Sequence, residues 1–196
     1  MIPGLDQRPL VVALAGPNGA GKSTFYGAHL AASGLRCINA DVLARELNID
    51  AYHAARLAAT LRDKLLEQRE SFVFETVFSD PVADKLGFLH KAAAAGCTVI
   101  LCFIGISDAA TSEARVAMRV TQGGHDVPSE KIAARFPRTL ANLRKGIQTL
   151  PCVMVFDNDD LSNPYRQVAV FSGGKAVFLS DSLPGWLTKI VKEIGS

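Results

Sequence analysis

The chain has 196 residues, of which 48% are hydrophobic and 20% are charged, and its formal net charge is +2. This length is enough for one domain with a stable core, so we expect residues 1–196 to form a single soluble domain. A charge so near neutral gives no signal for nucleic acid or a membrane as a partner. No apolar run approaches the roughly 20 residues that span a bilayer, and the N-terminus has no apolar signal-peptide segment. Together these features predict a cytoplasmic protein.

A phosphate-binding loop follows the first predicted strand. The apolar run 10–15 is typical of a buried parallel strand, and a helix is predicted to begin at Lys22. The residues at this junction fit the pattern G-x-x-x-x-G-K-[ST]: Gly16, Pro17, Asn18, Gly19, Ala20, Gly21, Lys22, Ser23 and Thr24. Glycines in such a loop let backbone N–H groups approach a polyphosphate, to which the helix N-terminus adds its positive dipole end. The loop therefore predicts ATP binding, with Lys22 at the β- and γ-phosphates and the Ser23 hydroxyl on Mg²⁺.

Asp41 is predicted to return to the same edge of the sheet as this loop. A helix over residues 22–33, closed by Gly34, descends ~18 Å over ~12 residues, and a short strand over residues 36–40 climbs back about as far at ~3.3 Å per residue. The carboxyl edge of an open α/β sheet is where ligands bind. We therefore expect the carboxylate of Asp41 to lie near bound phosphates.

The next helix and strand bring a second polar group to this edge. Leucines spaced by four predict a helix over residues 50–70. Its basic residues are expected on a solvated face: Arg56, Arg62, Lys64 and Arg69. A strand over residues 71–74 then delivers Glu75, Thr76 and Ser79 to the carboxyl edge.

The rest of the chain continues the alternation of helices and strands. Helices are predicted over residues 82–95, 109–119, from 129 onward and 186–194, and strands over residues 97–104, 152–156, 167–172 and 175–179. The last two strands read as a hairpin over Gly173-Gly174. The sequence thus predicts an α/β fold with three layers, of the P-loop NTPase or kinase type, with a mainly parallel sheet, a helical lid and a C-terminal β-hairpin.

The lid is predicted to span residues 109–146. Its two helices flank the pair Gly123-Gly124, which suits a mobile connection, and Ser129 can cap the second helix, which we expect to be kinked at Pro137. Four arginines flank the glycine pair: Arg115, Arg119, Arg135 and Arg138. Lid arginines commonly meet the charge that develops on a transferring phosphoryl group, although about half of these four fit a solvated helix face equally well. His125 is expected to hydrogen-bond within the lid.

Three carboxylates follow predicted strands and are therefore expected to face a bound nucleotide: Asp41, Glu75 and Asp157. Phosphoryl transfer needs one carboxylate to orient and deprotonate the acceptor hydroxyl, and usually another to hold Mg²⁺ directly or through water. An acidic residue at a strand end can also be a turn former or a helix cap. That alternative is strong for Asp157, which begins the turn-prone run 157–160.

Several of these motifs occur together in an order that resembles the zeta toxin family. They are the loop, then Asn39-Ala40-Asp41, Phe74-Glu75-Thr76-Val77-Phe78-Ser79, and Arg119-x-x-x-Gly123-Gly124-His125-x-Val127-Pro128 running into Ile132-x-x-Arg135-x-x-Arg138-x-x-x-Asn142. The likeness extends from about residue 10 to about residue 174. It implies a P-loop kinase fold and transfer of the γ-phosphate of ATP, with Mg²⁺, to a hydroxyl of a small acceptor such as UDP-N-acetylglucosamine or a similar nucleotide-like molecule. It also implies that a toxin role, with a cognate antitoxin as protein partner, is open to this chain.

The resemblance implies a role for each matching residue. Asp41 would be the catalytic base, while Lys22 and Ser23 would serve ATP and Mg²⁺. Glu75 and Thr76 would face the acceptor, and we expect Ser79 to bind it with them. The three arginines that match the family pattern would contact phosphates: Arg119, Arg135 and Arg138.

Two other classes of function are compatible with the loop. The sequence of the loop is common in the ATPase domains of ABC-type systems, but these domains carry a Ser-Gly-Gly signature before a strand ending in Asp-Glu. Here Ser172-Gly173-Gly174 comes after the fifth predicted strand, which ends in Asp157-Asn158 without a glutamate to activate water. A nucleotide-binding regulator without turnover is the second alternative. Release of ADP separates the three classes, because a kinase needs the acceptor, an ATPase does not, and a regulator releases none.

Overall fold

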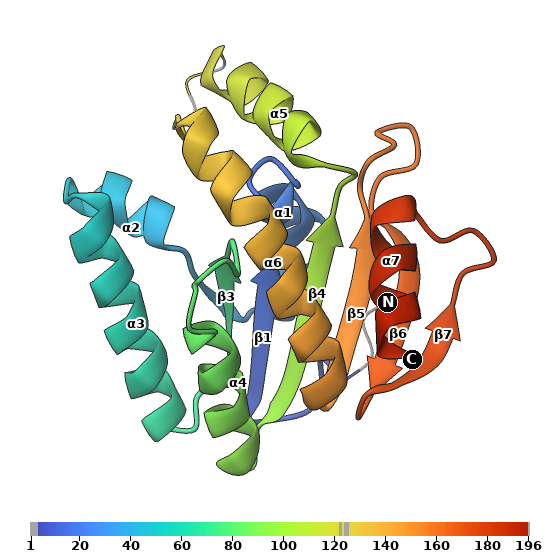
Figure 1. Cartoon of the computed structure of the whole chain (residues 1–196). Helices are drawn as coiled ribbons and strands as arrows, with labels where there is room; N and C mark the ends of the chain where they lie inside the picture. The colour runs from blue at the N-terminus through green and yellow to red at the C-terminus, as the bar shows by residue number, and fades with distance from the viewer. Residues whose placement is uncertain (1–3, 122, 124–125, 196) are drawn as a thin grey trace.

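A computed structural model of the protein describes residues 4–121, 123 and 126–195, in which a central sheet carries helices on both faces (Figure 1). The strands are β1 (Leu10–Ala15), β2 (Arg36–Ile38), β3 (Phe72–Thr76), β4 (Thr98–Gly105), β5 (Cys152–Asp157), β6 (Arg166–Ser172) and β7 (Lys175–Leu179). The helices are α1 (Lys22–Phe25), α2 (Ala40–Leu47), α3 (Ala51–Glu67), α4 (Asp84–Ala94), α5 (Ala109–Thr121), α6 (Ser129–Thr149) and α7 (Gly185–Ile194). A π-helical turn, η1 (Tyr26–Leu30), and a 3₁₀ turn, η2 (Ala31–Ser33), follow α1.

The described strands form one seven-stranded sheet in the order β2-β3-β1-β4-β5-β6-β7. Strands β2 to β5 pair in parallel, and β6 and β7 add an antiparallel hairpin at one edge. The predicted α/β fold, with its mainly parallel sheet and C-terminal hairpin, is confirmed. Because β1 lies between β3 and β4, the loop that follows it emerges at the centre of the carboxyl edge, where the strand order reverses and ligands bind in such sheets.

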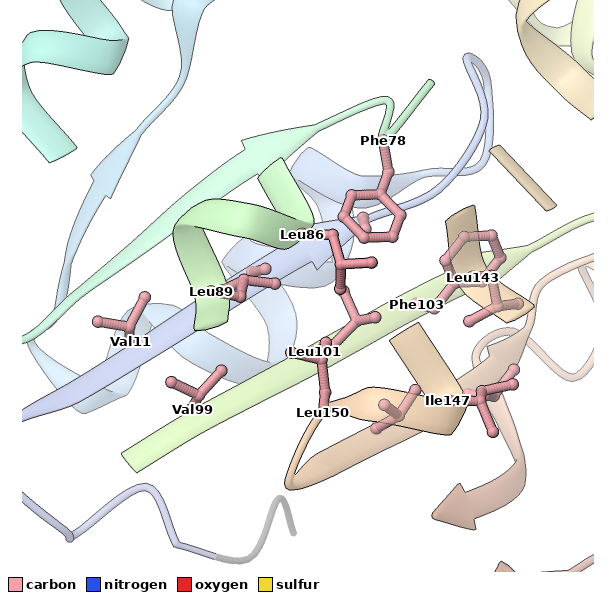
Figure 2. Packing of buried hydrophobic residues seen from close by; sticks show 14 of the residues in the cluster. Val11, Phe78, Leu86, Leu89, Val99, Leu101, Phe103, Leu143, Ile147 and Leu150 are labelled. Atoms are coloured by element: carbon pink, nitrogen blue, oxygen red, sulfur yellow. The ribbon is translucent and has the colours of Figure 1, made fainter. Parts of the chain in front are cut away.

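The centre of the sheet is buried on both faces, which explains why β1 is apolar at every position. Val11, Ala13 and Ala15 face one cluster of core residues, and the intervening side chains of β1 face the other. Figure 2 shows the first cluster, in which Leu86 and Leu89 of α4 and Leu143 and Ile147 of α6 pack over the sheet. This packing fixes α4 and α6, and with them the loop that joins β3 to α4.

Two segments near the phosphate-binding loop differ from the prediction. The helix expected over residues 22–33 is α-helical only to Phe25 and then changes to η1 and η2, although Gly34 closes it in a left-handed conformation with φ of 69°. Helix α2 was not predicted. The Asn39 side chain caps it by accepting hydrogen bonds from the backbone N–H groups of Asp41 and Val42, so the strand ends at Ile38 and Asp41 lies in the first turn of α2.

Helix α6 corrects one expectation, the cap at Ser129, while the kink expected at Pro137 stays a prediction. It runs without interruption through Pro137. Because proline has no N–H, the carbonyl of Ala133 loses its helical hydrogen-bond partner, but Ala133 is exposed to solvent. Ser129 does not cap it, because the residue at the N-cap position is Pro128 and no side chain caps this end. Among the described residues, no helix is both long and apolar enough to cross a membrane.

Candidate functional site

The phosphate-binding loop passes so close to its neighbours that two of its glycines are required. Gly16 has a φ of 146°, and a Cβ there would lie 2.1 Å from the carbonyl oxygen of Ile104. Gly21 precedes α1 with a φ of 87°, in the left-handed region that side chains disfavour. The loop therefore lies against β4 and turns directly into α1.

Side chains from distant segments hold three carbonyl groups of the loop. The Ser112 hydroxyl donates to the Asn18 carbonyl at 2.6 Å. Asn158 Nδ2 donates to the Ala20 carbonyl at 2.9 Å, and the Tyr165 hydroxyl donates to the Gly21 carbonyl at 3.0 Å. The sequence analysis missed all three side chains as part of the site.

Arg115 belongs to the same support. Its guanidinium donates to the backbone carbonyls of Asn158 and Asp159 at 2.7 and 2.8 Å, which ties α5 to the segment between β5 and β6. Of the four arginines that flank the glycine pair, this one therefore has a structural role. The lid interpretation itself stays a prediction, and His125 and Gly124 lie outside the described residues.

Lys22 lies buried at the start of α1. Its ammonium group donates to the carbonyls of Gly16 and Pro17, both at 2.9 Å, and lies 4.0 Å from Glu75 Oε1. Burial lowers the pKa of Lys22 from its ordinary value, while the carboxylates of Glu75 and Asp41 act in the opposite direction. A buried ammonium group at this position is a strong electrostatic partner for an anion.

Glu75 links the loop to the segment after β2. Its Oε2 atom accepts hydrogen bonds from the Ser23 hydroxyl and from Asn39 Nδ2, both at 2.9 Å. Sequence analysis expected Glu75 at the acceptor, and the structure places it within hydrogen-bond distance of the predicted Mg²⁺ ligand Ser23. A hydroxyl and a carboxylate fit Mg²⁺, which uses one or two protein oxygens together with phosphates and waters. The described residues contain no cluster of three or more His, Cys, Asp or Glu side chains able to hold a metal.

A cavity of about 460 Å³ opens beside the loop. Predicted site residues that line it are Asn18, Gly19, Lys22, Asp41, Glu75, Thr76, Ser79, Arg119, Arg135 and Arg138. The others, Gly16, Pro17, Ala20, Gly21, Ser23 and Thr24, are not part of its lining. Among the described residues that line the cavity, six are cationic and three are carboxylates, so the cavity attracts anions.

The wall of the cavity opposite α3 is the segment between β3 and α4, and α6 holds it in place. Asn142 Nδ2 donates to the carbonyls of Phe78 and Asp80 at 2.9 and 3.0 Å, and the Thr139 hydroxyl donates to the Val77 carbonyl at 2.9 Å. Phe78 has a φ of 61°, unusual for an aromatic residue, and its ring points into the core beside Leu86 (Figure 2). The same helix that presents two arginines to the cavity thus also shapes its wall.

Replacing Asn142 should loosen this wall without changing the phosphate-binding loop. In Asn142→Ala the buried carbonyl of Phe78 and the partly buried carbonyl of Asp80 lose their donor, so we expect a loss of about 2 kcal/mol in the free energy of unfolding, measured by urea denaturation. In a kinase assay the KM of the acceptor should rise while the Kd of ATP stays unchanged. Asn163→Ala, on an exposed loop, is the matched control. Unaltered stability would show that the two hydrogen bonds do not hold the wall.

Two expectations about charged residues are wrong. Asp157 does not face the nucleotide, because its carboxylate accepts a hydrogen bond from Trp186 Nε1 at 3.0 Å, lies 3.6 Å from Arg166, and so fastens α7 to the end of β5. Arg62 is not solvated, because only 7% of it is exposed and it lines the cavity. Both positions were misjudged because their partners are distant in the sequence.

Comparisons with known structures agree on the fold. A chain in two structures of the AvrRxo1-ORF1:AvrRxo1-ORF2 complex, one with sulphate ions and one with ATP, is 20% and 19% identical, with TM-scores of 0.73 and 0.71. Each match covers 97% of this chain and 65% or 64% of the other, so this chain spans less than two thirds of that protein. A chain in the structure of the PezAT toxin–antitoxin system of Streptococcus pneumoniae is 15% identical, with a TM-score of 0.61 over 97% of this chain and 85% of the other.

A putative kinase from Chloroflexus aurantiacus is 18% identical, with a TM-score of 0.56 over 80% of this chain and 92% of the other. At these identities the likeness concerns the fold, which is that of P-loop kinases. No curated protein sequence matches the chain. The sequence model of one family, described as an AAA domain, matches residues 11–144, from β1 into α6 and so across most of the site. The chain therefore belongs to the AAA domain family.

Proposed function

We propose that the protein is an ATP-dependent kinase that transfers the γ-phosphate of ATP to a hydroxyl group of a small acceptor. The observation that carries this proposal is that one cavity is lined by the loop lysine Lys22, by the carboxylate of Asp41 and by arginines of α5 and α6. Its volume of about 460 Å³ lies in the range of small-molecule sites, so there is room for an acceptor beside the phosphates. An ATPase would need no such space.

The loop and Lys22 would bind the phosphates of ATP. Three carbonyls of the loop are already bonded to side chains, which supports a loop whose N–H groups serve the ligand. Ser23 and Glu75 would hold Mg²⁺, which when bound would neutralise charge between the β- and γ-phosphates. Arg119, Arg135 and Arg138 would contact the transferring phosphoryl group.

Asp41 would act as the base toward the acceptor hydroxyl. It is exposed on the first turn of α2, and among the described residues its carboxylate accepts no hydrogen bond, so it is available to a ligand. Thr76 and Ser79 line the cavity on the β3–α4 wall and would bind the acceptor. A nucleotide sugar such as UDP-N-acetylglucosamine, or a similar nucleotide-like molecule, is the acceptor class that we favour, because the cavity is mostly cationic.

A toxin role with a cognate antitoxin is part of the proposal. The resemblance of the motifs to zeta toxins supports it, and so does the fold shared with a chain of the PezAT toxin–antitoxin system. Arrest of growth on expression, relieved by a neighbouring gene product, is the expected result.

The test of the kinase proposal is release of ADP with and without candidate acceptors, together with transfer of label from γ-labelled ATP. We expect ADP release to depend on one of a panel of nucleotide sugars and dinucleotides, and the label to appear on that compound. Release of ADP at the same rate without any acceptor would identify an ATPase instead. Binding of ATP with no ADP release under any condition would identify a regulator.

The arginines should act mainly during transfer. Arg119→Ala and Arg135→Ala should lower kcat by ~10-fold or more while the Kd of ATP changes little, because contacts made only in the transition state do not stabilise the ground state. The measurement is steady-state kinetics beside calorimetric titration with ATP. Lys131→Ala, an exposed change on α6 outside the cavity, is the control. Equal losses in kcat and ATP affinity would make these arginines ordinary phosphate-binding residues.

A further inference from the structure

Arg62 is a buried cation that the proposed chemistry does not use. It lies on α3 with only 7% of its surface exposed, and it lines the same cavity as Lys22 and Asp41. Three alanines of the same helix, Ala51, Ala55 and Ala58, also line the cavity, and their spacing places them with Arg62 on one face of α3. The small side chains leave open space along this face, and Arg62 lies at the end of this space.

The guanidinium of Arg62 has aromatic neighbours and, among the described residues, no hydrogen-bond acceptor. It lies 5.1 Å from the ring centre of Phe74 and 5.4 Å from that of Phe88, and it contacts both rings by cation–π interaction. Its Nε atom is buried without a hydrogen-bond partner among the described residues. A buried N–H without an acceptor destabilises the protein, so we expect this N–H to serve a function such as ligand binding.

The carboxylates near Arg62 are already engaged by other groups. Asp63 accepts a hydrogen bond from Lys91 at 3.0 Å, and Asp84 accepts one from Lys85 at 2.9 Å. Asp80 accepts a long hydrogen bond of 3.4 Å from the backbone N–H of Lys85. These three carboxylates interact with Arg62 through space only, while burial lowers the pKa of the guanidinium. Lys91 and Lys85 pair with Asp63 and Asp84, and among the described residues Arg62 itself forms no ion pair, so its guanidinium can pair with a further anion.

The direction of α3 brings this guanidinium toward the ligand. The helix begins near the carboxyl edge of the sheet and runs away from it (Figure 1), and side chains on a helix lean toward its N-terminus. The Arg62 side chain therefore reaches back along the alanine face toward the edge where the phosphate-binding loop lies. An acceptor whose hydroxyl lies at Asp41 can extend along this face to Arg62.

We propose that Arg62 determines acceptor specificity by binding an anionic group of the acceptor, a phosphate or a carboxylate, at the end of the cavity remote from the transferred phosphoryl group. This inference rests on the proposed kinase function, since it assumes that the cavity holds the acceptor. A planar guanidinium in contact with two aromatic rings suits two oxygen atoms of such a group, which would supply the missing hydrogen bonds. Neutral sugars and nucleosides would leave Arg62 unpaired and bind more weakly.

The test measures binding to the protein saturated with Mg²⁺ and a non-hydrolysable ATP analogue, by calorimetry. The phosphate-bearing probes are UDP-N-acetylglucosamine and nicotinamide adenine dinucleotide, the carboxylate probe is gluconate, and the neutral counterparts are uridine and glucose. We expect at least one anionic probe to bind about 10- to 100-fold more tightly than its neutral counterpart, as for a charge-assisted bidentate pair. The difference between phosphate and carboxylate probes identifies which anion the site takes.

Variants of Arg62 should remove this preference. Arg62→Gln should weaken the anionic probe by about 10- to 100-fold and leave the neutral one unchanged, and Arg62→Lys should retain part of the preference. Arg56→Gln is the matched control, because Arg56 lies exposed on the same helix outside the cavity. The affinity for the ATP analogue should stay the same in all three variants, and thermal melting checks that each is folded.

Several results would overturn the inference. They are equal affinity for anionic and neutral probes in the unaltered protein, no binding of any anionic probe, or full anion binding by Arg62→Gln. The first two need no variant, so they hold even if Arg62→Gln does not fold. Phosphorylation of an anionic acceptor at the same rate by Arg62→Gln as by the unaltered protein would reject the role of Arg62 and keep the kinase. Release of ADP that does not depend on an acceptor would reject the kinase function. It would not decide anion binding by Arg62, because that binding is measured separately, with a non-hydrolysable ATP analogue.

Discussion

Lys22→Ala should weaken ATP binding by about 10²-fold or more and abolish turnover. The change removes a buried ammonium group that would form charge-assisted hydrogen bonds with phosphate oxygens, each of which contributes about 1.5–3 kcal/mol. In the structure this group donates to the carbonyls of Gly16 and Pro17, so exchange of these carbonyls for phosphate oxygens needs little movement. Calorimetric titration with ATP and Mg²⁺, beside the ADP-release assay, measures both effects.

A matched pair of variants separates charge from length at this position. Lys22→Met keeps most of the side-chain volume and removes the charge, so it should weaken ATP binding as Lys22→Ala does. Lys64→Ala removes an exposed lysine that pairs with Glu67 on α3, and ATP binding should be unaffected. Unchanged ATP affinity in Lys22→Ala and Lys22→Met would make the assignment of the loop to a nucleotide wrong.

The parts of the site that sequence could predict are those determined by short segments. The loop is one contiguous motif whose glycines are required by local backbone geometry, as the contacts of Gly16 and Gly21 show. The return of Asp41 to the loop follows from the lengths of one helical segment and one strand. Asp41 lines the cavity beside the loop even though the prediction missed α2, the helix in which it lies. That short helix was missed because Asn39, its cap, was interpreted as part of a strand.

The side chains that support the site were not predictable in this way. Asn158 and Tyr165 bond to loop residues 138 and 144 positions away along the chain, so no local pattern marks them. Arg62 was misjudged because a charged residue on an amphipathic helix is usually solvated, and its burial depends on Phe74 and Phe88, which come from other elements. Asn142 was part of the family-like motif, but only the structure shows that it holds the wall of the cavity.

Asp41→Asn should lower turnover by ~10²-fold or more, the range for loss of a positioned general base, while ATP still binds. The substitution keeps the size of the side chain and its place on the first turn of α2, and the Asn39 cap bonds to the backbone N–H of residue 41, which is unchanged. Single-turnover transfer from labelled ATP to the identified acceptor measures the loss. Glu46→Gln, which removes a carboxylate from the exposed face of the same helix outside the cavity, should have no effect.

The result for Asp41 also decides between Asp41 and Glu75, two of the three carboxylates that line the cavity. If the protein is a toxin, Asp41→Asn should relieve growth arrest on expression, whereas Glu46→Gln should not. Near-normal transfer in Asp41→Asn would make Asp41 a helix-terminal residue without a chemical role, and Glu75 would become the candidate base. The hydrogen bonds of Glu75 argue against that outcome, because its Oε2 atom is shared by Ser23 and Asn39 and is directed to the loop side of the cavity. Glu75→Gln should therefore raise the Mg²⁺ concentration needed for half-maximal turnover more than it alters the pH profile. Asp41→Asn should alter the pH profile more than it changes this Mg²⁺ concentration.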